Sequence, residues 1–401
     1  MKRFGAAIMA VVGLVVALGA PVAALGFGGF TERTYAWNEV NPAAPWGRRA
    51  GLQVQYLDGK LYLMGGRTPR PPSTPVIPGD SDIHADVWTS ADQGGTWEQV
   101  LATDTPGHWP ARAYFSSVTL GGYLYVIGGQ DYEVVPNPCT LPFCPPLVSQ
   151  SDFFRDVWRS RDGVHWEQRT AQAPWEGRAG LSAAALNGAL YVFGGSQNDD
   201  AAIIGGPPAR IYFRDVWKST DGGATWQKVA DAPWAARAGA ATVVKDGYIY
   251  LLGGEKGFLC SPFPGCTLPY FNDVWRTRDG ATWQLVNPSA PWSPRPGHKC
   301  EALVSRIVCF GGFGLPENPM DVWESTNGAV WKLVRRTAWN ATNPAQIRYD
   351  FATAVVPGGP FGLTSSILTF GGDRETFNFS DPVNYLRVDD DVWRLRLTPA
   401  G

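Results

Sequence analysis

Short apolar segments bounded by turn residues follow one another along almost the whole chain. The segment AGLQVQYL at 50–57 is followed by LYLMGG at 61–66, DVWTS at 86–90 and GTWEQV at 95–100. Apolar, β-branched and aromatic residues that alternate with polar ones between turns are typical of short β-strands. The 47 Gly and 33 Pro exceed ordinary usage and supply the turns. The pattern predicts an all-β protein of many short strands.

One unit of the chain recurs six times. It has an Arg that opens a strand of small residues, a strand ending in Gly-Gly, a variable loop, Asp-Val-Trp, a short turn and a second Trp. The arginines are Arg49, Arg112, Arg178, Arg237, Arg295 and Arg348, the Gly pairs begin at Gly65, Gly128, Gly194, Gly253, Gly311 and Gly371, and Asp-Val-Trp begins at Asp86, Asp156, Asp215, Asp273, Asp321 and Asp391. Six units of four short antiparallel strands predict a six-bladed β-propeller.

The two ends of the chain complement each other. After Trp393 only eight residues remain, too few for a turn and a fourth strand, whereas Tyr35–Val40 matches the fourth-strand pattern of the other units. The N-terminal strand is therefore expected to complete the last blade and to cover two open sheet edges. This predicts a single domain over 35–401.

The tryptophan content follows the repeat. The 18 Trp divide into one on the third strand, one on the fourth strand and one before the Arg of each unit. Each can bury on the order of 200 Å² between neighbouring sheets. We expect the twelve strand residues to belong to the scaffold, and the six that precede the arginines to be candidates for ligand contact: Trp46, Trp109, Trp175, Trp234, Trp292 and Trp339.

The N-terminus and the cysteines indicate the compartment. Residues 1–24 combine a basic start, an apolar run and small residues before a cleavage point, which predicts a secretory signal peptide, with an uncleaved membrane anchor as the alternative. Residues 25–34 are then a linker, and the mature chain is secreted or periplasmic without a membrane span. The cysteines form three local pairs that suit disulfides in an oxidising compartment: Cys139 with Cys144, Cys260 with Cys266, and Cys300 with Cys309.

Charge and residue spacing remove several kinds of partner. The net charge is -2, and the chain has no basic field of the kind that nucleic acid or an anionic membrane requires. The cysteines lack the paired CxxC spacing of a zinc site and the four His are scattered, so we expect no metal and no cofactor. The chain is expected to be a monomer.

The Arg strand, the Gly-Gly strand end and the fourth-strand Trp resemble kelch repeats over about Tyr35 to Leu397. A second resemblance lies in the turn before the fourth strand, where Ser90–Trp97 and Ser219–Trp226 read Ser-x-Asp-x-Gly-x-Thr-Trp, as in the Asp box of sialidases and related propellers. Three other units carry a shortened form of this turn. Its usual meaning is structural, because Asp and Gly set a tight turn.

The candidate site lies on the face that carries the long loops after Gly-Gly. Six arginines near one axis would bind a carboxylate or another anion, and the alternative is that each Arg pairs with the Asp of its own unit. Departures from the repeat add candidates, because Tyr114 and Asp350 stand where four units have Gly, and His298 stands where others have Leu, Phe or Ala. Further polar or aromatic groups near this face are Lys299, Glu301, Tyr349, Arg67, Asp131, Glu255, Lys256, Asp373, Arg374 and Glu375.

Two functions are compatible with this face. The first is an exported binding module that presents the six arginines, Tyr114, Tyr349 and the loops to a protein, a peptide or an acidic glycan. The second is a sugar-active enzyme similar to the periplasmic sialate mutarotases, which resemble this chain in export, blade number and ring of arginines. That resemblance implies acid/base groups that interconvert sugar anomers, for which Asp350, Glu301 and His298 are the candidates.

Overall fold

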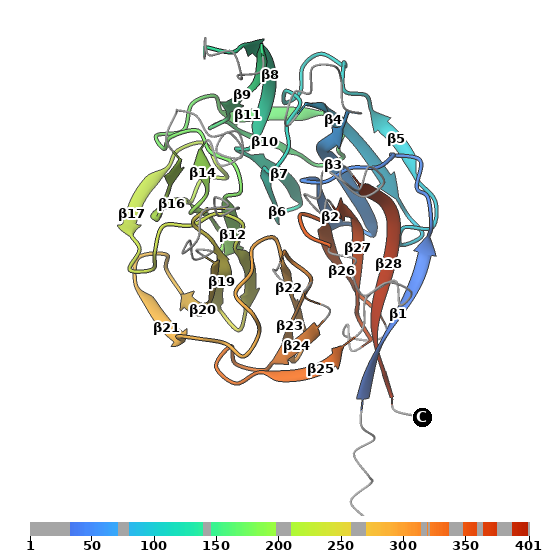
Figure 1. Ribbon diagram of the computed structural model, residues 1–401, viewed down its shortest axis with the longest axis vertical. Coiled ribbons are helices and arrows are strands. Elements are labelled where there is room, and N and C mark those ends of the chain that lie inside the picture. The colour runs from blue at the N-terminus through green and yellow to red at the C-terminus, as the bar shows by residue number, and fades with distance from the viewer. Residues whose placement is uncertain are drawn as a thin grey trace, which may run out of the picture.

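The computed structural model describes residues 33–70, 80–138, 146–197, 210–257, 270–313, 319, 321–336, 348–358, 364–374 and 387–399. Within these ranges all regular secondary structure is β, and six four-stranded antiparallel sheets surround one axis (Figure 1). No helix in the described ranges is long and apolar enough to cross a membrane. The predicted six-bladed propeller is confirmed.

Each of the first five blades is built from four strands in chain order, innermost first, with a separate hairpin inserted between the second and third strands of blades 2 and 3. Blade 1 contains β2 (Gln53–Leu57), β3 (Lys60–Pro69), β4 (Ser81–Ser90) and β5 (Glu98–Leu101). Blade 2 contains β6 (Ser116–Leu120), β7 (Tyr123–Ile127), β10 (Val157–Ser160) and β11 (Trp166–Thr170). Blade 3 contains β12 (Ser182–Leu186), β13 (Ala189–Phe193), β16 (Asp215–Ser219) and β17 (Gln227–Asp231).

The remaining blades follow the same order. Blade 4 contains β18 (Ala241–Lys245), β19 (Tyr248–Glu255), β20 (Tyr270–Thr277) and β21 (Trp283–Asn287). Blade 5 contains β22 (Lys299–Leu303), β23 (Arg306–Phe310), β24 (Asp321–Ser325) and β25 (Lys332–Arg336). Blade 6 contains β26 (Ala352–Val356), β27 (Ser366–Asp373), β28 (Val388–Pro399) and β1 (Arg33–Asn41).

Two small hairpins extend the loops on the Gly-Gly side of blades 2 and 3. They are β8 (Gln130–Pro136) with β9 (Leu147–Phe153), and β14 (Ser196–Gln197) with β15 (Ile211–Tyr212). In Figure 1 the β8–β9 hairpin stands out beyond the outline of the disc. We call this side the loop face and the opposite side, with its uniform hairpin turns, the short-turn face.

The N-terminal strand closes the ring. β1 pairs with β28 in antiparallel register from Arg33 opposite Pro399 to Asn41 opposite Val392. Its buried Tyr35 donates a 2.9 Å hydrogen bond from the hydroxyl to Glu324 of blade 5. The closing strand thus ties the last two blades together, as predicted, although it begins at Arg33, inside the stretch predicted as a linker. The predicted signal peptide lies outside the described residues.

The hydrophobic core is divided among the interfaces between neighbouring blades. In five units the Trp that precedes the Arg is 0–3% exposed. Its ring packs edge-on against the fourth-strand Trp of its own unit, with centroids 4.4–6.3 Å apart. The expectation that these tryptophans contact a ligand is therefore wrong for Trp46, Trp109, Trp175, Trp234 and Trp292, because they fill the core. Trp339 lies outside the described residues.

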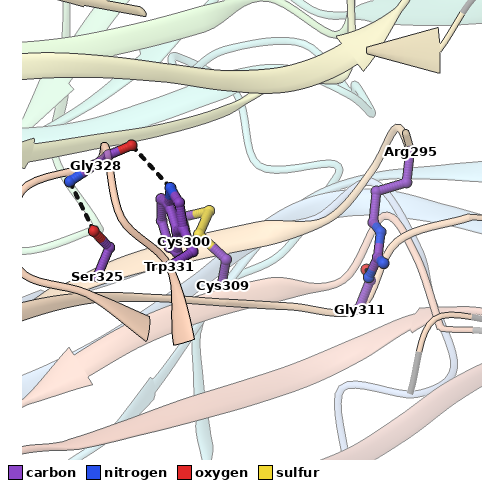
Figure 2. Close-up of a disulfide and its surroundings, with 7 residues drawn as sticks. All are labelled: Arg295, Cys300, Cys309, Gly311, Ser325, Gly328 and Trp331. Carbon is purple, nitrogen blue, oxygen red and sulfur yellow. Dashed lines mark hydrogen bonds between the residues drawn. A yellow bond between two sulfur atoms is a disulfide. The ribbon is translucent and has the colours of Figure 1, made fainter. Parts of the chain in front are cut away.

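A disulfide links Cys300 and Cys309, which stand directly opposite each other on β22 and β23. Both are buried, and Figure 2 shows the bridge beside the indole of Trp331. This predicted pair is confirmed.

The other two predicted disulfides fall in the loops after β8 and β19. The first would join Cys139 to Cys144, and the second would join Cys260 to Cys266. All four of these cysteines lie outside the described residues. The structure therefore shows one of the three expected bridges, and the bridge of Cys139 with Cys144 and that of Cys260 with Cys266 stay predictions.

Candidate functional site

The six repeated arginines are held inside the blades. Each Nη1 donates to the carbonyl of the first Gly of its own Gly-Gly pair and, at 2.5–2.7 Å, to the Asp of its own Asp-Val-Trp motif. The same Asp accepts a hydrogen bond of 2.7–2.8 Å from the third-strand Trp two residues later. Figure 2 shows the Arg295 side chain beside Gly311, one of its partners. We call this arrangement the Arg–Asp–Trp clamp.

The clamps favour one of the two roles considered for the arginines. The six side chains are only 0–5% exposed, and each guanidinium is neutralised by a carboxylate of its own blade. In blade 6 the clamp is enlarged, because Asp389 also pairs with Arg348 and Arg374. Burial and the charge of Arg348 lower the pKa of Arg374 to about 10. The geometry is that of scaffold pairing, and it leaves no ring of free guanidinium groups at the axis.

The Asp-box turns are also satisfied internally. In the first, Asp92 accepts hydrogen bonds from the Thr96 backbone and hydroxyl, and Ser90 bridges Asp92 and the Gly94 backbone. Burial favours the neutral carboxyl, but these donors outweigh it and lower the pKa of Asp92. For the same reasons the pKa of Asp221 falls to about 2. These turns support the fourth-strand Trp, whose Nε1 donates to the Gly carbonyl three residues earlier.

A closed ring of backbone hydrogen bonds surrounds the axis just inside the loop face. The residue two positions after each Arg donates its N–H to the carbonyl of the equivalent residue in the preceding blade, at 2.9–3.3 Å all the way round. All six residues have φ between 49° and 65°. This left-handed conformation suits the Gly of four blades and strains Tyr114, whereas Asp350 is of a residue type that adopts it more readily.

Polar side chains gather beside this ring. Arg67, the residue after the first Gly pair, donates from Nε to the Tyr114 hydroxyl at 2.6 Å and from Nη2 to Asp373 at 2.8 Å. Glu255 lies next to the ring at Gly239, and Asp350 lies next to it at Gly297. We call these five residues the axial polar layer. One cation and three carboxylates give it a net negative charge.

Two predicted site residues belong to the core instead. His298 is 2% exposed and packs against Gly253 and Gly312 between blades 4 and 5. Burial lowers its pKa to about 3, so its imidazole is neutral at physiological pH. Tyr349 is 2% exposed and its ring lies edge-on to Phe313. Both occupy packing positions away from the residues that line the central cavity.

The other predicted polar groups are more scattered. Burial raises the pKa of Asp131, which lies at the base of the β8–β9 hairpin, and Lys256 is exposed on the loop after β19. Arg374 belongs to the blade 6 clamp, and Glu375 lies outside the described residues. The axial polar layer therefore gathers only part of the set that the sequence proposed.

A cavity of about 340 Å³ lies farther along the axis, between the backbone ring and the short-turn face. Its wall comes from the middle of each inner strand, and among the described residues that line it Glu301 is the charged one. The Thr353 hydroxyl donates to Glu301 Oε1 at 2.5 Å. Lys299 precedes Glu301 by two residues on β22, and burial lowers its pKa while the charges of Asp350 and Glu301 raise it. The sequence pointed to Glu301 but not to the cavity.

Comparison with known proteins agrees with this architecture. Residues 111–140 match the kelch motif, and residues 157–286 match the DUF6242 beta propeller domain. Over 235 residues the chain is 29% identical to Kelch domain-containing protein 3 of Rattus norvegicus and 27% identical to that of Homo sapiens, covering 57% of this chain and 53% of each relative. The chain thus spans about half the length of these curated relatives. The predicted resemblance to kelch-repeat propellers is confirmed.

A solved structure, described as "Structure of YjhT", matches with a TM-score of 0.58 and 18% identity, covering 88% of this chain and 96% of that chain. At this level of identity the likeness shows the fold alone. The structural match and the sequence matches together support a kelch-type propeller, a fold that commonly serves as a protein-binding module.

Proposed function

We propose that the protein is an exported binding module whose loop face binds a protein or peptide through the sector formed by blades 6, 1 and 2. The observation that carries this proposal is the pair of non-glycine exceptions in the backbone ring. Four blades have Gly at this position, whereas Tyr114 of blade 2 and Asp350 of blade 6 keep a side chain there at φ 54° and 49°. Strain of this kind is concentrated at functional sites.

The neighbouring contacts favour the same sector. Arg67 of blade 1 lies between blades 2 and 6 and bonds to Tyr114 on one side and Asp373 on the other. The β8–β9 hairpin of blade 2 adds an exposed edge, on which Val134 is 41% exposed. A projecting hairpin beside a fixed polar layer is the kind of surface through which loops on a rigid scaffold bind their partners.

Export is part of the proposal. The predicted signal peptide supports it, and so does the buried Cys300–Cys309 bridge, because disulfides form and persist in oxidising compartments. Finding the mature N-terminus near residue 25 in the secreted or periplasmic fraction would support export. An intact N-terminus in the cytoplasmic fraction would contradict it.

The sugar-active alternative receives less support from the geometry. An acidic sugar needs a free cationic group, whereas the six arginines are each paired with an aspartate and the axial polar layer is net negative. Of its proposed acid/base residues, His298 is packed in the core. Anomer-exchange NMR with sialic acid tests it directly, and interconversion above the uncatalysed rate would restore this alternative.

The binding proposal is tested by selecting peptides from a displayed library against the mature protein and measuring their affinity for variants. Tyr114→Gly and Asp350→Gly restore the Gly of the other blades, so they remove side chains without blocking the backbone ring. We expect each to weaken binding at least tenfold. Val330→Ser, on an Asp-box turn where Val330 is 73% exposed, is the matched control on the short-turn face. Equal losses in all three variants, or none, would contradict the proposal.

A further inference from the structure

The central cavity has a wall unlike the rest of the inner strands. Small apolar residues such as Ala184, Val243 and Ala354 make up much of it, but Gln55, Thr353 and Glu301 also line it. Gln55 Nε2 is held by the Ser117 carbonyl at 2.9 Å, which orients the carboxamide. The cavity therefore combines one carboxylate with an oriented amide and several hydroxyl groups.

Among the described residues, only one of the two carboxylate oxygens of Glu301 accepts a hydrogen bond. Oε1 accepts the hydrogen bond from Thr353, whereas Oε2 has no hydrogen-bond partner among the described residues and is not sealed from solvent. The hydroxyls of Ser117 and Thr242, by contrast, are sealed from solvent and have no partner in the part of the chain that the structure describes. Buried polar groups are nearly always hydrogen-bonded. Glu301 Oε2 is therefore an acceptor of this wall that a polar occupant can reach.

The charges near the cavity favour a cation as that occupant. Lys299 lies between the cavity and the backbone ring, and it makes no ion pair within the described residues. Asp350 lies on the far side of Lys299 from the cavity. The axial channel formed by the cavity and the ring therefore holds the carboxylates of Glu301 and Asp350 and the ammonium group of Lys299. At the short-turn end Lys245 is neutralised by Asp246. The two carboxylates outnumber the one ammonium group, so the net charge of these residues is negative. Among the described residues that line the cavity, the charged one is Glu301.

We propose that the cavity is a binding site for a small organic ammonium ion that carries hydroxyl groups. Its ammonium group binds Glu301 Oε2, and its hydroxyls bond to the Gln55 carboxamide. Tyr56 also lines the cavity, and an aromatic ring there can contribute a cation–π contact. The ligand enters from the short-turn face, because the hydrogen-bonded backbone ring closes the other end.

This site is separate from the loop-face binding proposed above. The cavity is lined by residues five to seven positions after each Arg, whereas the ring lies two positions after it. At about 3.4 Å per residue the two are about 10 Å or more apart along the strand. A loop-face variant such as Val134→Ser should therefore leave ammonium binding unchanged, so the two proposals can fail independently.

The test uses a matched pair of ligands, 2-amino-1,3-propanediol and glycerol, which differ only in whether the central substituent is an ammonium or a hydroxyl group. Binding to the full mature chain is measured by calorimetry and ligand-detected NMR at pH 7. We expect saturable binding of the amine, at least tenfold weaker binding of glycerol, and weaker amine binding at high ionic strength.

Three variants locate the site. Glu301→Gln keeps the shape and should weaken amine binding at least tenfold, whereas Glu98→Gln, on an exposed outer strand, should not change it. Lys299→Met should strengthen binding several-fold, because it removes a competing positive charge. The proposal is overturned if neither ligand binds, if glycerol binds as tightly as the amine, or if Glu301→Gln binds the amine as the parent does. A thermal melt of each variant confirms that it is folded.

Discussion

The clamp of blade 3 allows the scaffold role of the arginines to be measured. The Arg178 side chain is 0% exposed and donates to the carbonyls of Glu176 and Gly194 and, twice, to Asp215 at 2.5 and 3.0 Å. Its guanidinium also lies 3.8 Å from the Phe213 ring centroid. The perturbation is Arg178→Met, which keeps an apolar stem and removes the charge and every donor.

The expected loss in the free energy of unfolding depends on the contacts that Asp215 keeps when Arg178 is replaced. Asp215 is 15% exposed and would keep only the 2.7 Å hydrogen bond from Trp217 Nε1. Two charge-assisted hydrogen bonds contribute about 1.5–3 kcal/mol each. Breaking a buried pair by removing one partner costs about 3–5 kcal/mol. We therefore expect Arg178→Met to lower the free energy of unfolding by about 3–5 kcal/mol at pH 7.

The pH dependence has a defined sign. Burial alone would raise the pKa of Asp215, but the hydrogen bonds and charge of Arg178 outweigh it and hold this pKa below its ordinary value of 3.8. A carboxyl whose pKa is lower in the folded state stabilises the fold above its unfolded pKa, and that stabilisation is lost as the pH falls through the folded value. The difference between parent and Arg178→Met should therefore shrink between pH 7 and pH 3.

The assay is urea denaturation followed by tryptophan fluorescence, on Arg178→Met, Asp215→Ala and the double variant. Residues that share hydrogen bonds are coupled, so the double variant should be more stable than the sum of the single effects predicts, by about 2 kcal/mol. The scaffold interpretation is refuted if Arg178→Met costs less than about 1 kcal/mol while peptide binding is lost, because Arg178 would then act on a ligand.

Three other positions give independent tests. Tyr114→Gly should stay within about 1 kcal/mol of the parent, since relief of left-handed strain offsets the lost hydrogen bond to Arg67, and a loss above about 2 kcal/mol in denaturation would make Tyr114 structural. The pKa of His298 is about 3 in the folded protein, so between pH 6.5 and 4.5 only the unfolded chain takes up this proton, which lowers the free energy of unfolding by about 2–3 kcal/mol. His298→Phe should remove this loss, and an unchanged dependence of stability on pH would contradict the prediction. Replacing Cys300 and Cys309 together by Ala should cost about 2–3 kcal/mol for a bridge that closes nine residues, with reduced parent protein as the control.

The architecture could be predicted from the sequence because each blade uses local contacts that repeat. Tyr35 and Trp37 identified the closing strand from its pattern alone, and β1 pairs with β28 as that pattern required. The direction of Trp46 and its equivalents could not be predicted in this way. Sequence places these residues before the arginines, but only the packing shows that they turn inward onto the fourth-strand Trp.

The central cavity is harder to predict from the sequence, because its wall depends on the rotation of each inner strand. Gln55 and Glu301 both lie six residues after their Arg and are partly exposed, whereas Ala184 and Val243 hold the same position and are buried. The repeat makes these positions look equivalent, and the phase of each strand against its neighbours makes them different. The sequence singled out Glu301 as an unusual residue but could not show that it lines a cavity.

Strain in the backbone ring gives the strongest reason to place function in one sector. All six ring positions need a left-handed backbone, which costs a residue such as Tyr about 1–2 kcal/mol and Asp less, and Gly removes that cost in four blades. The two blades that keep a side chain flank blade 1, whose Arg67 bonds to Tyr114 and to Asp373 of blade 6. A purely structural ring would gain from Gly at both positions. The proposed loop-face ligand, contacting blades 6, 1 and 2 together, would account for the side chains at Tyr114 and Asp350.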